Sequence, residues 1–139
     1  MRIIGFNFDK INVEKLSNKI ENLKINSNVN ISELKEIKSE IFKGEETIIN
    51  VKFSYNLNYD PNFAKIDFIG NIIFSIKPEK AKEILKQWEN KKIVEDFKVV
   101  LFNLILKKTT LKALQLEDEL NLPLHIQLPS LKFDNEKNK

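Results

Sequence analysis

The sequence predicts an α+β fold in which a four-stranded antiparallel sheet is followed by two long helices. Apolar and polar residues alternate through much of the first half of the chain, most clearly at residues 48–59. From residue 78 onward, apolar residues recur three and four positions apart, the spacing of an amphipathic helix. The 139 residues contain no internal repeat and no linker, so we predict one domain at residues 1–133 and a disordered polar tail at residues 134–139.

The first two strands are the less clear ones. Residues 2–14 alternate as a strand does, and a shift of phase at Asp9 indicates a bulge. Residues 15–28 are rich in Asn and Lys, so we predict a loop there with room for one helical turn. Residues 29–42 fit a helix as well as a strand, and the turn residue Gly44 favours the strand.

The last two strands have stronger signals. Six apolar residues alternate with polar ones at 48–59, and the Asp-Pro-Asn turn at 60–62 ends this strand. The final strand is predicted at residues 63–76. Ile69 and Ile73 make part of this strand apolar on its second face as well, so we expect something to cover that face.

Two helices follow. Pro78 suits the first turn of a helix whose apolar stripe ends at Trp88. A second helix is predicted from Ile93 to Lys108, and residues 109–120 either continue it or form a further short helix. Because the second helix is apolar nearly all round, we expect it to be buried between subunits. An extended apolar tail is predicted from Leu122 to Phe133.

The composition excludes most classes of catalyst. The chain has no Cys, only three scattered Gly and one His, so a thiol nucleophile, a two-histidine metal site and a phosphate-binding Gly loop are absent from the sequence. We interpret His125 as a polar residue on an extended segment and the acidic run at 117–119 as a solvated surface. We therefore predict no catalytic residue, no metal and no cofactor, and expect that the protein is not an enzyme.

The charge pattern bears on partners and location. The net charge is only +3, and the lysines are interspersed with 20 acidic residues, which argues against nucleic-acid binding. The longest apolar stretch, at 99–106, is too short to span a membrane, and the first residues do not form a signal peptide. We expect a cytoplasmic protein without membrane insertion. The Lys- and Glu-rich, Cys-free composition is typical of a thermophile, although 17 Asn indicate the opposite.

Several aromatic residues lie near the ends of predicted elements, where the core does not need them. Tyr59 and Phe63 flank the strand turn, and Phe133 lies in the tail. Apolar groups at such places are candidates for an exposed binding groove. Trp88 fits the core, and we also include it among the groove candidates.

The order of elements and four segments resemble the SecB family of bacterial export chaperones. The similar segments are the end of the last strand with Gly70, the Ile-Val to Phe segment at 93–97, the closing Leu-Pro-Ser-Leu-Lys-Phe at 128–133, and the first strand at 9–14. The resemblance covers nearly the whole chain.

The resemblance implies a dimer of dimers, with helices sandwiched between sheets, that acts as an ATP-independent holdase for unfolded or nascent polypeptides in protein transport. It places Phe97 and Phe133 among groove aromatics, and Ile93 and Val94 at apolar positions of the same helix connection. The family docks an export ATPase partly through an acidic sheet surface. On the polar sheet face predicted here only Asp67 is acidic, so we do not expect that docking.

Alternatives remain within this interpretation. The client could be any unfolded chain or a dedicated one, such as an antitoxin-like protein. A sheet wrapped around a helix could instead enclose a pocket for a small apolar ligand. The protein could also be a structural subunit of a complex.

Overall fold

The computed structural model describes residues 1–38 and 44–133, so the polar tail predicted at 134–139 lies outside the described residues. Its elements are the strands β1 (Arg2–Lys15), β2 (Lys24–Ile37), β3 (Thr47–Asp60) and β4 (Ala64–Ile76) and the helices α1 (Pro78–Trp88) and α2 (Glu95–Leu120). The predicted α+β fold, a four-stranded antiparallel sheet followed by two helices, is confirmed.

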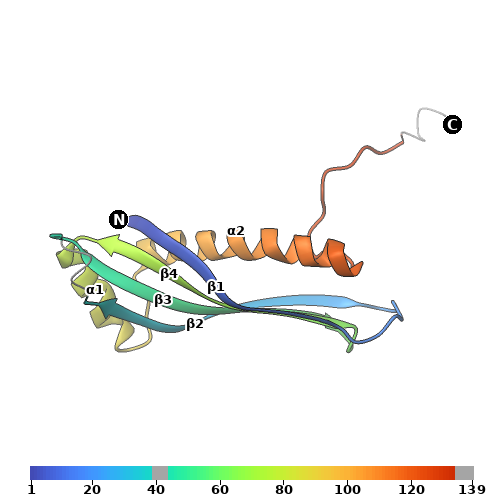
Figure 1. Cartoon of the computed structure of the whole chain (residues 1–139), viewed down its shortest axis with the longest axis horizontal. Helices are drawn as coiled ribbons and strands as arrows, with labels where there is room; N and C mark the ends of the chain where they lie inside the picture. The colour runs from blue at the N-terminus through green and yellow to red at the C-terminus, as the bar shows by residue number, and fades with distance from the viewer. Residues whose placement is uncertain (39–43, 134–139) are drawn as a thin grey trace.

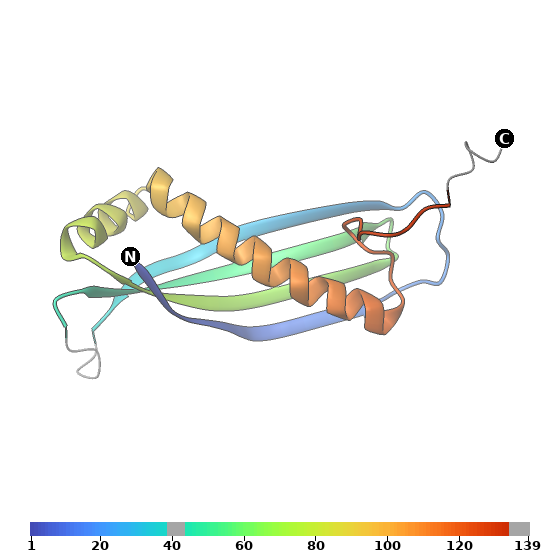
Figure 2. The same ribbon diagram turned by 90° about the horizontal axis from the view of Figure 1, so that it is seen from above.

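The strands lie in the order β1-β4-β3-β2, which places β1 and β2 at the two edges of the sheet. Helix α2 runs along the length of the sheet, and α1 lies at one end (Figure 1). Seen from above, α2 crosses the strands diagonally (Figure 2). No helix of the described residues is long and apolar enough to cross a membrane.

The alternation in β3 and β4 sorts the side chains between two faces. Every second residue faces the helices and is buried; these residues are Ile49, Val51, Phe53, Tyr55, Leu57, Tyr59, Ile66, Phe68, Ile72, Phe74 and Ile76. The opposite face is polar, and there Asp67 accepts hydrogen bonds from Asn56 (2.6 Å) and Asn12 (3.4 Å). Asp67 is thus engaged with side chains of the two neighbouring strands.

Helix α2 buries one residue in four along most of its length: Phe97, Leu101, Ile105, Thr109, Ala113 and Glu117. Since an α-helix has 3.6 residues per turn, a spacing of four moves the buried stripe gradually around the helix. This drift accompanies the diagonal crossing in Figure 2. The single continuous helix decides between the two predictions for residues 109–120. The Thr109 hydroxyl donates to the Ile105 carbonyl of its own helix (2.7 Å) and caps no new one.

Two other element predictions have clear outcomes. The bulge predicted at Asp9 is confirmed, because the register between β1 and β4 shifts between Phe8 and Lys10. The loop predicted at 15–28 is wrong in its second half, where β2 begins at Lys24. Ser27 stands where the alternation of this edge strand would have an apolar residue. The strand pattern is therefore not recognisable from the sequence in residues 24–28. The strand favoured at 29–42 is confirmed as far as Ile37, and residues 39–43 lie outside the described residues.

Candidate functional site

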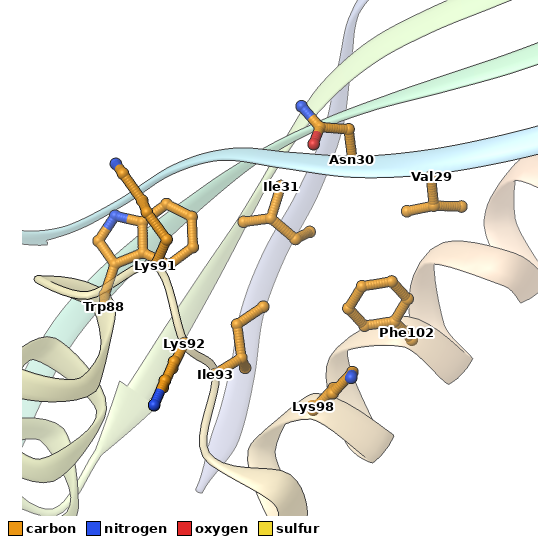
Figure 3. A pocket seen from close by; sticks show the side chains of 9 residues that line it. All are labelled: Val29, Asn30, Ile31, Trp88, Lys91, Lys92, Ile93, Lys98 and Phe102. Carbon is orange, nitrogen blue, oxygen red and sulfur yellow. The ribbon is translucent and has the colours of Figure 1, made fainter.

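An open cavity of about 660 Å³ lies between the edge strand β2 and the connection from α1 to α2. Its lining comes from β2, the end of α1, the connection and the first turns of α2, and consists of Val29, Asn30, Ile31, Trp88, Lys91, Lys92, Ile93, Lys98 and Phe102. Figure 3 shows Ile31, Ile93 and Phe102, from three different elements, pointing toward a shared space. We call this cavity the β2 groove. Its lining combines five apolar side chains with Asn30 and with three lysines at its rim.

The end of α1 forms one wall of the β2 groove. The Lys91 N–H donates to the Trp88 carbonyl (2.8 Å), and the Lys92 N–H donates to the Gln87 carbonyl (3.0 Å). These are the two bonds of a Schellman motif, which requires a left-handed residue after the helix. Lys91 is that residue, with φ of 58°. The turn brings Ile93 to the groove directly after the helix.

An ion pair connects α1 to the first turn of α2. Lys80 Nζ lies 2.7 Å from Asp96 Oδ2, while Asp96 Oδ1 accepts the Phe97 N–H at 2.9 Å. The hydrogen bond from Lys80 lowers the pKa of Asp96, and the same bond raises the pKa of Lys80. Both groups are charged at neutral pH, and together they hold the start of α1 against the start of α2.

Three of the predicted groove residues lie at or beside this cavity. Trp88 and Ile93 line it, and Val94 packs partly buried against the core next to it. Trp88 is the only tryptophan of the chain, and the ammonium of Lys91 lies 4.5 Å from its ring centre. The helix connection is therefore the part of the predicted site that the structure brings together.

The other predicted groove residues lie elsewhere. Phe97 is fully buried, with its ring 5.0 Å from that of Phe74 in an edge-to-face contact, so it is a core residue in this chain. Tyr59 and Phe63 are also buried, in the core cluster at the far end of the sheet, which corrects the expectation that they are exposed. Phe133 is 79% exposed on the C-terminal segment. It does not line the β2 groove.

Sequence reasoning missed the contributions of β2 and α2 to the groove. Val29 and Ile31 lie in the segment that fits a helix as well as a strand, and Phe102 lies on the predicted helix that is apolar nearly all round. The alternation Ile25, Val29, Ile31 is the signal that could have placed this side of β2 over the helices. The alternation in β2 does not predict the contact with Phe102, because that contact depends on the angle at which α2 crosses the strands.

A buried polar cluster lies at the other end of α2. Glu117 has no exposed surface; its carboxylate accepts hydrogen bonds from the Tyr59 hydroxyl, the His125 N–H (3.0 Å) and the His125 Nδ1–H (2.9 Å). Burial is the main cause that raises the pKa of Tyr59, and its hydrogen bond to Glu117 raises it further. Burial also raises the pKa of Tyr55, to about 12. The interpretation of Glu117 as part of a solvated surface is wrong, and His125, interpreted as a polar residue on an extended segment, contacts this buried carboxylate. The cluster fastens the start of the C-terminal segment to the sheet.

Apolar side chains are also exposed outside the β2 groove. On α2 they are Val99, Val100, Leu106 and Leu111, and on the C-terminal segment they are Leu124, Ile126, Leu128, Leu131 and Phe133. Figure 1 shows this segment leaving the sheet on the side of α2. An apolar surface of this extent is typical of a protein that contacts other chains.

Comparison with known proteins places the fold. No protein-family model matches the chain, and no curated protein matches its sequence. The fold is that of SecB-like chaperones. One solved structure with this fold is the SecB-like chaperone Rv1957 of Mycobacterium tuberculosis, in complex with a ChAD peptide from the antitoxin HigA1 (Rv1956). The TM-score is 0.53 with 12% sequence identity, over 95% of this chain and 92% of that chain.

Proposed function

We propose that this protein is an ATP-independent chaperone, a holdase, that binds unfolded or nascent polypeptides in the β2 groove. The observation that carries the proposal is an open cavity of about 660 Å³, lined by both apolar side chains and lysines, in the fold of a SecB-like chaperone. Burying apolar client surface is worth about 25 cal/mol per Å² before ordering costs, so such a groove holds many sequences loosely. The mechanism needs no catalytic residue.

The position of the groove beside an edge strand supports an extended client. The outer side of β2 has no neighbouring strand in the described residues, so its backbone N–H and C=O groups are open to a peptide. A strand added there alternates its side chains, and every second one faces Val29 and Ile31. The register shift between Ile31 and Glu33 limits how far such pairing extends.

We also propose that the protein assembles as a homotetramer, a dimer of dimers, and acts in the cytoplasm. The exposed apolar residues of α2 support assembly, because water contact at Leu106 and Leu111 is unfavourable for a lone chain. Two half-buried residues of β4, Ile69 and Ile73, lie on the other face of the sheet and also favour a contact there.

An aggregation assay without ATP tests the proposed function. At a stoichiometric ratio the wild-type protein keeps a denatured client from aggregating, and Phe102→Ser, which removes a groove wall, reduces this protection. Ile20→Ser is the matched control, because Ile20 is 63% exposed on the loop between β1 and β2. Wild-type protein that leaves the client unprotected would contradict the proposal.

A further inference from the structure

We propose that the β2 groove selects client segments in which a large apolar residue is flanked by Asp or Glu, and that Lys92 and Lys98, with Lys91, determine this choice. The inference rests on the proposed function and names the class of peptide that the groove prefers. It follows from three observations on the rim: its charge, its lack of ion pairs and the backbone of Lys91.

The charge of the rim has one sign. Three of the nine lining residues are lysines and none of the nine is acidic. Lysines 91, 92 and 98 are exposed, so their ammonium groups reach a bound chain without being buried. Apolar side chains and exposed lysines therefore line the same cavity, a combination that suits a peptide with an apolar centre and charged flanks.

The three lysines are free to bind such flanks. Among the described residues, the ion pairs involve other cations. Asp96, in the first turn of α2, is held by Lys80 at 2.7 Å. Glu89 and Glu95 are exposed and do not line the groove. The positive charge of the rim is therefore not neutralised from within the groove.

Lys91 occupies a position that favours a different residue. The left-handed residue after a helix is usually Gly or Asn, because a side chain clashes with the backbone in that conformation. Lys91 adopts it with φ of 58° and keeps its ammonium 4.5 Å from the ring centre of Trp88. An unfavourable backbone at the edge of a cavity indicates that the side chain serves a purpose there.

The expected selectivity is moderate. Exposed ion pairs change an affinity by roughly 1.5- to 5-fold each, so two acidic flanks improve binding by roughly 2- to 25-fold over neutral ones. Apolar contacts supply most of the affinity, and the lysines decide between clients. Because the Debye length falls from about 10 Å at 0.1 M salt to about 3 Å at 1 M, the preference should disappear at high salt.

The test uses the full chain and three labelled peptides that share one Trp-free apolar centre. Their flanks are two Glu, two Gln or two Lys, and affinity is measured by anisotropy while the emission of Trp88 reports occupation of the groove. We expect the Glu-flanked peptide to bind tightest and the Lys-flanked one weakest at low salt. All three should converge toward 1 M salt.

A charge-reversed pair of variants identifies the residues responsible. Lys92→Glu with Lys98→Glu should invert the order of the peptides, and Lys91 is kept because it contacts the reporter Trp88. The control, Lys10→Glu with Lys52→Glu, changes the net charge equally. These lysines pair with Ile69 and Asn71 on the sheet face away from the helices. The control should keep the wild-type order.

The outcomes separate the two proposals. If all three peptides bind with equal affinity and shift the Trp88 emission, the selectivity is overturned and the chaperone proposal stands. If the control inverts the order as well, overall charge and not the rim is responsible, which also overturns the selectivity. If no peptide binds, the proposed function fails, and the selectivity fails with it.

Discussion

Glu117 is a carboxylate without exposed surface, and its oxygens accept hydrogen bonds from two residues. The Tyr59 hydroxyl and two N–H groups of His125 donate to it. Hydrogen bonds to a buried charge are worth about 1.5–3 kcal/mol, and leaving one group unpaired costs as much. The sequence shows Glu117 inside an acidic run. Glu117 is buried because the buried residues of α2 recur every four positions from Phe97. A stripe that recurs every 3.6 positions would have turned away from Glu117 over that length, so the helical period does not predict its burial.

The cluster predicts how stability changes at high pH. The folded state holds the Tyr55 proton up to a pKa of about 12, against 10.0 for an exposed tyrosine, and holds that of Tyr59 more strongly still. The folded state then binds more protons than the unfolded state above pH 10. The free energy of unfolding should be constant up to pH 10 and fall by about 2 kcal/mol per tyrosine toward pH 12.

Denaturant unfolding at each pH measures this fall. In Glu117→Gln the carboxylate that raises both tyrosine pKa values is gone, so the curve should be less steep above pH 10. An equal slope in both proteins would show that Glu117 does not hold the tyrosine protons.

Gly70 gives a second prediction for a single residue. A Cβ at Gly70 would lie 2.6 Å from the Asn7 carbonyl oxygen and 2.7 Å from the ring of Phe53, whereas a Cβ at Gly5 meets nothing within 4 Å. Gly70→Ala should therefore lower the free energy of unfolding by about 1–3 kcal/mol, and Gly5→Ala should change it little. Chemical denaturation of both variants is the measurement, and equal stabilities would contradict the packing at Gly70.

Among the elements, those with strong local patterns were predicted well. β3, β4 and α1 each carry an uninterrupted alternation or stripe, and the bulge at Asp9 is visible as a shift of phase. The start of β2 was missed because Ser27 replaces an apolar residue, which an edge strand tolerates. The continuation of α2 beyond Lys108 was left open, since Thr109 can either cap a new helix or bond back to its own.

The two helix ends differ in how well their residues suit the backbone. Asn121 and Lys91 both adopt the left-handed conformation, and Asn tolerates it better than Lys. Lys91→Gly should raise the free energy of unfolding by about 0.5–1 kcal/mol, because it removes this strain. Lys92→Gly is the control without positive φ and should not stabilise. Thermal unfolding distinguishes them, and a destabilised Lys91→Gly would contradict the account of this helix end.

The whole molecule combines segments that are far apart in sequence. Ile93 could be proposed from the sequence because the helix connection resembles that of a known family, and Trp88 could be proposed only as one of the aromatic residues. Val29, Ile31 and Phe102 complete the β2 groove only through the order of strands and the crossing of α2. Those two properties depend on packing across the sheet, so a local pattern does not contain them.

Assembly is the second property at this scale. If α2 is buried between subunits, light scattering should give a mass above that of one 16.3 kDa chain. Leu106→Lys with Leu111→Lys should reduce that mass, since charges in an apolar interface are costly. Ile20→Lys places the same charge on an exposed loop residue and should leave the mass unchanged. A wild-type monomer would contradict this expectation.

The emission of Trp88 during titration with a permanently unfolded, Trp-free polypeptide tests the central claim most directly. Trp88 is the only tryptophan and lines the β2 groove, so the signal comes from the proposed site alone. Our account predicts a saturable shift of the emission to shorter wavelength that follows the bound fraction of client and needs no ATP. A client that binds and is protected from aggregation while the Trp88 emission stays unchanged would contradict it.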